Sequence, residues 1–232
     1  MLLLCTAIFS TEDTGNVPEY ERKTWELNQL AERFKAETGF VGEVGHSTNT
    51  MRLHTYRGNF SGIYFSSEGD TIAFRQACEM IVEKILPFSP ANRMQLSMSR
   101  ISKSVRGYTT DYIQQVDGYG VEGAGFIMIT CDSGRKHFSI GDNTVELPDG
   151  VNVQISKEEA FQIARSEFEK SPLCNKDTPP WRHKSLIQFK SRKIGDVQLP
   201  YRLKWQIVFP GIVYYIDAET GEWFCEGYVI NQ

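Results

Sequence analysis

Residues 201–208 alternate cleanly between apolar and polar side chains. Every second side chain is apolar and belongs on one side of a strand: Tyr201, Leu203, Trp205 and Ile207. The intervening Arg202, Lys204 and Gln206 belong on the other side. A strand with this period of two fits a sheet that has one buried face and one open face. The chain must therefore supply a layer that covers the apolar face.

A helix at 157–170 is the candidate for this layer. Ser156 and Glu159 form a capping-box pattern, in which each side chain satisfies the other's backbone amide. Apolar residues then recur at helical spacing: Ala160, Phe161, Ile163, Ala164 and Phe168. The prolines within 171–181 prevent the helix from continuing. Further strands are predicted at 186–190, 213–218 and 222–229, and these complete an antiparallel meander.

Two helices are predicted earlier in the chain. Residues 19–38 carry apolar side chains at helical spacing and end at Gly39, a suitable stop. Asp70 is an N-cap for a second helix that ends at Pro87. The apolar face of this second helix comprises Phe74, Ala77, Cys78, Ile81, Val82 and Ile85. Between the helices, short strands are predicted at 54–56 and 63–65.

Short β segments follow the second helix, at 94–105, 109–116, 126–130 and 136–140. Residues 70–140 and 156–229 thus each run from a helix into a meander, with little sequence identity between them. The expected fold class is α+β, with two similar lobes that each pack a helix on an antiparallel β-meander.

Three segments of the C-terminal third match a known pattern in order and spacing. They are 155–164 (I-S-K-E-E-A-F-Q-I-A), 201–205 (Y-R-L-K-W) and 214–222 (Y-Y-I-D-A-E-T-G-E). They resemble the helix start, the Y-x-L-x-W strand and the D-A-x-T-G-E turn of PepSY domains. Upstream, residues 111–121 and 126–134 resemble the segment before PepSY in propeptides of thermolysin-type (fungalysin/thermolysin) peptidases. The extra residues around Gly123 depart from that pattern.

The resemblance implies a cystatin-like or PepSY-like fold and a division of the chain into four parts. Residues 1–18 are a signal remnant and disordered lead, and 19–69 are an N-terminal helix and short strands without assignment. Residues 70–150 are a propeptide-like lobe, and 151–232 are a PepSY-like domain. In each lobe a helix lies on a sheet whose other face is free to meet a partner.

The resemblance also implies a function. It indicates a non-catalytic extracytoplasmic protein, secreted, periplasmic or on the cell surface, that binds and inhibits or modulates a peptidase or another envelope protein. A similar doubled arrangement occurs in membrane-anchored regulators of two-component sensor kinases, and an ectodomain of that type is the alternative. Neither interpretation assigns binding residues.

The sequence offers no constellation for catalysis, so we expect no catalytic residue, no cofactor and no metal. A thermolysin-type zinc site needs H-E-x-x-H, and none of the four histidines has a second histidine four residues on: His46, His54, His137 and His183. Gly118–Gly123 fits G-x-G-x-x-G, but a β-rich run follows it where a dinucleotide site needs a helix. These glycines indicate a hairpin instead.

Five cysteines are separated by tens of residues, which excludes a C-x-x-C metal or redox pair: Cys5, Cys78, Cys131, Cys174 and Cys225. Two interpretations stay open. The last four form two disulfides in an oxidising compartment, or Cys78 and Cys131 are ordinary buried thiols.

The apolar start, residues 1–9, is far shorter than the ~20 residues of a membrane span. It is interpreted as the end of a truncated signal peptide, with Cys5 lipidated or near a cleavage site, or else as a short buried strand. Membrane anchoring would then depend on a missing or truncated N-terminus.

The charge balance and the aromatic residues complete the sequence-based expectations. The net charge of −4 includes no run of like charge, which argues against a nucleic-acid partner. Several aromatic residues exceed what one small sheet needs inside and are candidates for a binding surface: Trp181, Tyr214, Tyr215, Trp223 and Tyr228. For any single one of them, packing in the core is the favoured interpretation.

Overall fold

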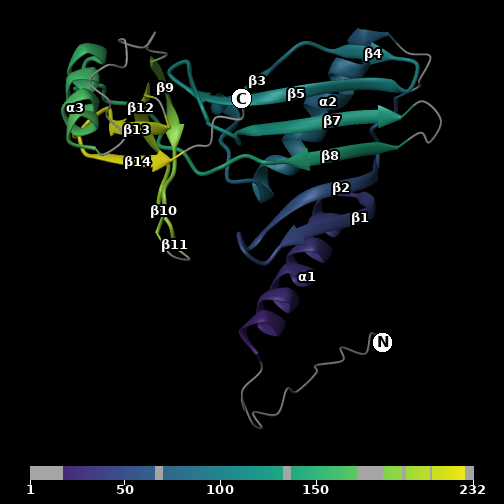
Figure 1. Ribbon diagram of the computed structural model, residues 1–232. Coiled ribbons are helices and arrows are strands. Elements are labelled where there is room, and N and C mark those ends of the chain that lie inside the picture. Colours follow the sequence, from purple (N-terminus) through teal and green to yellow (C-terminus); the bar gives the residue numbers. More distant parts are fainter. Residues whose placement is uncertain are drawn as a thin grey trace, which may run out of the picture.

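The computed structural model describes residues 18–65, 70–132, 137–171, 185–194, 197–209 and 211–227. Within these ranges the chain is α+β, with three α-helices and strands that pair antiparallel in two main sheets and one small hairpin (Figure 1). The helices are α1 (Glu19–Thr38), α2 (Thr71–Ile85) and α3 (Lys157–Lys170). All three coincide with the helices predicted from the sequence.

The larger sheet collects strands from the first two thirds of the chain. Its order is β1-β2-β8-β7-β5-β3, and β4 and β6 pair with β5. The strands are β1 (Phe40–Ser47), β2 (Arg52–Phe60), β3 (Leu96–Met98), β4 (Ser102–Ser104), β5 (Gly107–Val116), β6 (Tyr119–Gly120), β7 (Phe126–Asp132) and β8 (Phe138–Asp142). Two short 3-10 helices, Leu86–Phe88 and Arg93–Gln95, connect α2 to β3. The single strand predicted at 94–105 is thus replaced by the end of a 3-10 helix and the two short strands β3 and β4.

The core of the larger sheet lies between its rear face and helices α1 and α2. The predicted apolar face of α2 is confirmed, because all six of its residues are buried in this core. Asp70 accepts a hydrogen bond from the Ala73 amide at 2.8 Å, so the predicted N-cap is present. Figure 1 shows α2 behind the sheet and α1 beside β1 and β2.

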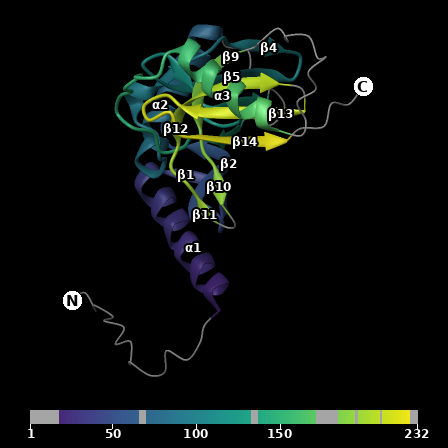
Figure 2. The same cartoon turned by 60° about the vertical axis from the view of Figure 1, so that its left-hand side comes forward.

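Helix α1 is packed along only part of its length. Its buried side chains are Leu27, Ala31, Phe34 and Thr38, all from residue 27 onward. Tyr20 and Trp25, near its start, are 67% and 64% exposed. Figures 1 and 2 both show this end of the helix projecting away from the sheets.

Strand β1 and most of β2 were missed by the sequence prediction. The expected strand at 54–56 lies inside the longer β2, whereas 63–65 is not a strand. Gly42 and Gly58 face each other across β1 and β2. A Cβ atom at Gly42 would lie 2.1 Å from the Arg57 carbonyl oxygen, so glycine is required there. Because such glycines are also typical of loops, the composition of β1 and β2 did not indicate strands.

The smaller sheet contains β9 (Ser185–Lys190), β12 (Arg202–Phe209), β13 (Ile212–Asp217) and β14 (Trp223–Gly227), in the order β14-β13-β12-β9. Strands β10 (Lys193–Ile194) and β11 (Val197–Gln198) form a separate hairpin. Helix α3 covers one face, with Ala160, Ala164 and Phe168 buried against the sheet (Figure 2). The helix covers the Trp205 and Ile207 end of the alternating strand, whereas Leu203 and Tyr201 pack against Val116 and Leu147 instead.

The other face of the smaller sheet differs from the expectation of an open surface. Lys204, Tyr215, Asp217 and Phe224 lie on it and are buried. The Lys204 Nζ lies 3.1 Å from an Asp217 oxygen and 5.5 Å from the centre of the Phe224 ring. The long lysine side chain thus covers an aromatic ring while its charge is paired, which period-two alternation does not reveal.

Candidate functional site

The three PepSY-like segments meet one another in the structure. The Trp205 indole donates a 2.8 Å hydrogen bond to the Ile155 carbonyl oxygen. The backbone amides of Gln154 and Ile155 both donate to the Ala218 carbonyl oxygen, at 2.8 and 2.9 Å. The start of α3, the strand β12 and the turn after β13 are therefore joined at one place.

The capping box at the start of α3 is confirmed. The Glu159 amide donates to Ser156 Oγ at 3.2 Å, and the Ser156 amide donates to a Glu159 carboxylate oxygen at 2.8 Å. The hydrogen bonds from the Ser156 backbone and side chain lower the pKa of Glu159. Both side chains are thus committed to starting the helix.

The aspartate of the D-A-E-T-G-E segment organises the turn that ends β13. One Asp217 carboxylate oxygen accepts the amides of Glu219 and Thr220 at 3.1 and 3.0 Å, and the other accepts Lys204. Burial alone would raise the pKa of Asp217, but the hydrogen bonds from the Thr220 amide and from Lys204 outweigh it and lower this pKa. Gly221 follows in the left-handed region, at φ 75°.

The glutamine pair of the upstream segment has one buried member, Gln114. Its side-chain amide nitrogen donates to the Val145 carbonyl at 2.7 Å and to the Gln95 side chain at 3.0 Å. Its side-chain oxygen accepts the Val145 amide at 3.0 Å. Nearby, an Asp117 carboxylate oxygen accepts the Val151 amide at 3.1 Å. Strand β5 and the turn after it therefore fasten the connection between β8 and α3.

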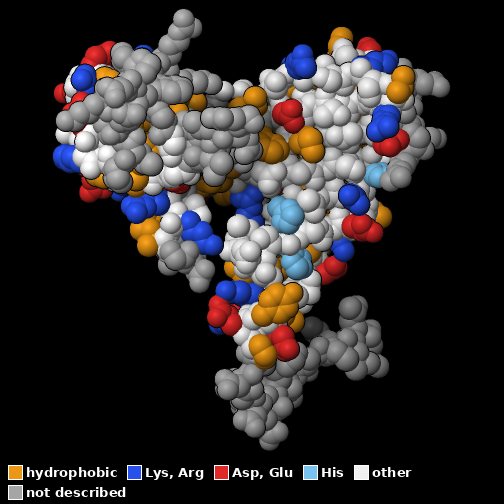
Figure 3. Space-filling model, in the orientation of Figure 1, with side chains coloured by type: hydrophobic (Ala, Val, Ile, Leu, Met, Phe, Trp, Pro, Cys, Tyr) orange, Lys and Arg blue, Asp and Glu red, His pale blue; other side chains and the backbone are white. Residues whose placement is uncertain are grey.

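This connection, residues 143–155, forms one wall of a cleft between the two main sheets. The cleft has a volume of about 1010 Å³. Its apolar side includes Leu147, Phe189 and Leu203, which belong to a buried cluster that joins the two sheets. The opposite wall consists of residues 198–203, from the end of β11 to the start of β12. In Figure 3 the surface is hollowed between the part that carries the β10–β11 hairpin and the part that carries β1 and β2.

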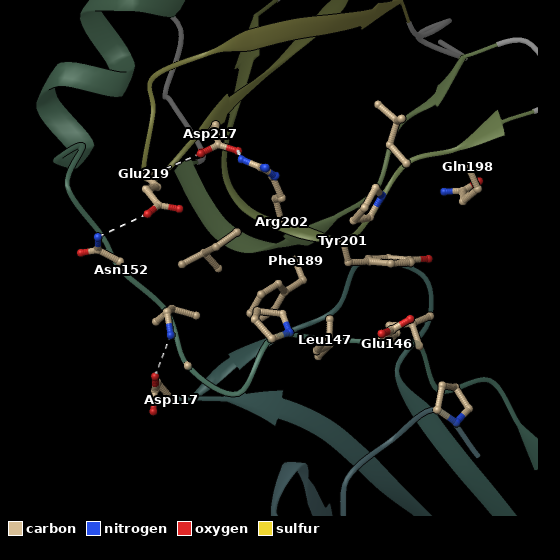
Figure 4. Close-up of a pocket in the computed structure, with 18 of the residues that line it drawn as sticks. Asp117, Glu146, Leu147, Asn152, Phe189, Gln198, Tyr201, Arg202, Asp217 and Glu219 are labelled. Atoms are coloured by element: carbon tan, nitrogen blue, oxygen red, sulfur yellow. Dashed lines mark hydrogen bonds and ion pairs between the residues drawn. The ribbon is translucent and has the colours of Figure 1, made fainter. Parts of the chain in front are cut away.

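Charged side chains surround the apolar part of the cleft. Arg52 donates hydrogen bonds to the carbonyl oxygens of Asp142, at 2.7 Å, and of Thr144. Arg202 is largely exposed and lies 3.9 Å from Asp217. Glu146 is exposed and has no ion pair within the described residues. Figure 4 shows Glu146 and Tyr201 to the right of Phe189, with Asp117, Asn152 and Glu219 to the left.

The residues considered for a metal site or a dinucleotide site do not come together in the structure. Within the described ranges, no three His, Cys, Asp or Glu side chains gather as metal ligands. His46 lies 3.2 Å from the Asn28 side chain, and His183 is outside the described residues. The glycine-rich segment 118–123 contains β6 and then a bridge from Val121 to Phe189 of β9, so no helix begins there.

The structure also gives the burial of most of the cysteines and of the aromatic residues considered for a binding surface. Cys78 and Cys131 are buried free thiols, and Cys225 is an exposed one, so no disulfide joins these three. Burial raises the pKa of the Cys78 and Cys131 thiols. Tyr214 and Tyr215 are buried, whereas Trp223 is 43% exposed. The remaining candidates lie outside the described residues: Cys5, Cys174, Trp181 and Tyr228.

Comparisons with known proteins give little further information. No protein-family model matches the chain, and no curated protein sequence matches it at a significant level. Among solved structures, the C-terminal domain of YpeB from Bacillus megaterium aligns over 86% of this chain and 95% of its own. The identity is 12% and the TM-score is 0.31. A similarity this distant assigns neither a family nor a function.

Proposed function

We propose that this chain is a non-catalytic PepSY-type protein that acts outside the cytoplasm. In this proposal it binds a peptidase or another envelope protein and inhibits or modulates it. The supporting observation is that the three PepSY-like segments meet through Ile155, Trp205 and Ala218. A chance match of short motifs would give no reason for these segments to bond to one another.

The proposal includes a fold of two similar lobes. In one, α2 is followed by the antiparallel strands β3–β8, and in the other α3 is followed by β9–β14. The first lobe is extended by α1, β1 and β2, which add two strands to its sheet. The repeated order of a helix and then a meander supports this interpretation.

The absence of catalysis is likewise a proposal, and the use of the motif side chains supports it. Asp217, Glu159 and Gln114 are three polar residues of the PepSY-like and propeptide-like segments, and each bonds to backbone groups. A catalytic acid or base needs a side chain that reaches a substrate. The bonds of these three side chains to the backbone support a role in the fold.

An inhibition assay tests the proposal. The full chain would be titrated into thermolysin, and into peptidases that it captures from envelope and extracellular fractions of the organism that encodes it. We expect the rate of hydrolysis of a fluorogenic peptide to fall as the chain is added, and the two proteins to co-elute. If every captured peptidase keeps its full activity, inhibition is refuted.

Helix α1 favours the sensor-kinase alternative. Its first turns project from the fold and expose Tyr20 and Trp25. None of the described helices is long and apolar enough to cross a bilayer. In this alternative, α1 would transmit contact between the two main sheets and a membrane kinase. Replacing Tyr20 and Trp25 with Ala would then abolish kinase regulation, whereas a peptidase inhibitor would keep its inhibition after the same change.

A further inference from the structure

We infer that the cleft between the two main sheets binds an extended segment of the partner protein, in which a Lys or Arg side chain is flanked by apolar residues. This inference rests on the proposed function, because it names where and how the partner is held. Three features of the cleft carry it, namely its size, its uncompensated negative charge and its fixed walls.

The size and lining favour a chain segment over a small ion. Ligand pockets typically enclose about 300–1,000 Å³, and this cleft, at about 1010 Å³, is at the upper end. Phe189 and Leu203 line it, and Tyr201 and Leu199 lie on the wall between β11 and β12. Apolar side chains of an extended segment would be buried against these residues.

The charges favour a basic residue in that segment. Four carboxylates line the cleft: Asp117, Glu146, Asp217 and Glu219. Lys204 pairs with Asp217 at 3.1 Å, and Arg52 lies 3.7 Å from Asp142, a carboxylate outside the lining. Arg202, the other cation of the lining, lies 3.9 Å from the same Asp217, so no ion pair within the described residues compensates the other three carboxylates. The excess of negative charge complements a Lys or Arg side chain.

Glu146 is the carboxylate best placed to bind that Lys or Arg side chain. Asp117 accepts the Val151 amide, and Glu219 lies 3.4 Å from the Asn152 side chain. Glu146 has no such partner among the described residues and lines the same cleft as Tyr201. A Lys or Arg side chain bound in the cleft would form a charge-assisted hydrogen bond with this carboxylate.

The cleft walls are held in place before any ligand arrives. The Gln114 side chain is hydrogen-bonded to both the amide and the carbonyl of Val145, and the Asp117 carboxylate accepts the Val151 amide. On the other wall, Leu199 donates its amide to the Arg192 carbonyl at 2.9 Å. A preformed groove loses little conformational entropy on binding, which favours affinity for a short segment.

Three labelled peptides that differ only at the central residue test this inference. They are acetyl-Gly-Val-Leu-X-Val-Leu-Gly-amide, with X as lysine, norleucine or glutamate, and binding to the full chain is measured by fluorescence anisotropy. We expect the lysine peptide to bind about 10-fold more tightly than the glutamate peptide at low salt. This difference should shrink as salt screens the cleft carboxylates.

Two variants locate the binding. Glu146→Gln should weaken the lysine peptide by about 5-fold and leave the norleucine peptide unchanged. Gly150→Phe should abolish binding of all three peptides, because Gly150 lines the cleft and an added Cβ would approach only an Asp117 oxygen, at 3.8 Å. Gly141→Phe is the matched control, since Gly141 lines a second hollow and has no atom within 4 Å of an added Cβ.

The outcomes separate this inference from the proposed function. The inference is overturned if none of the peptides binds, if lysine and glutamate peptides bind equally, or if Gly141→Phe is as harmful as Gly150→Phe. If the chain inhibits a peptidase and Gly150→Phe inhibits it equally well, the function stands and the cleft is not the site. If the peptides bind as expected but no captured peptidase is affected, the cleft stands and the inhibitory function fails.

Discussion

Replacing Gln114 with Leu tests whether its side chain supports the cleft wall. Gln114 is fully buried and bonds to both backbone groups of Val145. Leucine has a similar size but offers no donor or acceptor, so the Val145 amide and carbonyl would lose their partners. Each orphaned group costs about 1–3 kcal/mol when buried. Val145 borders the cleft and is partly reached by water, so we take about 1–2 kcal/mol for each group.

The expected loss of unfolding free energy is therefore about 2–4 kcal/mol. With a urea m-value of about 2–3 kcal/mol/M for a chain of this size, the unfolding midpoint should fall by about 1 M. Circular dichroism in urea measures this shift, and hydrogen exchange at the Val145 amide should accelerate. Gln115→Leu is the matched control, because Gln115 is the exposed neighbour on the same strand. Equal midpoints for the two variants would refute the assigned role.

Three further predictions concern the fold around the cleft. The pKa of Asp217 is lower in the folded chain than its ordinary 3.8, so its contribution to stability is complete above that pH and is lost as the pH falls through the folded value; Asp217→Asn should flatten the stability profile in acid unfolding experiments. Gly42→Ala should destabilise the chain by several kcal/mol in thermal melts, through the clash across β1 and β2, whereas Gly141→Ala should have little effect. Trp205→Phe removes the hydrogen bond to Ile155 and should cost about 1–2 kcal/mol in urea, and an unchanged midpoint would show that the contact is unimportant.

The helices were predictable because their signals are local. Asp70, Ser156 and Gly39 mark helix ends through their own side chain or backbone conformation. The apolar spacing between these ends then fixes which face is buried. Each of these signals lies within a few residues of the structure that it determines.

Strand β1 and the cleft were not predictable in this way. Gly42 and Gly58 are required by a contact between two strands, and their composition alone resembles a loop. The cleft brings Glu146, Phe189 and Arg202 together from segments that are far apart in the sequence. A single sequence gives no signal for contacts that depend on how two sheets are placed.

The fastened connection between β8 and α3 has a thermodynamic consequence. It bonds to β5 through Gln114 and Asp117, and to the turn after β13 through Gln154 and Ile155. Neither sheet can therefore open fully at this connection without breaking bonds that also hold the other. The larger and smaller sheets should melt in one cooperative transition, and a ligand that bridges the cleft would raise the stability of both at once.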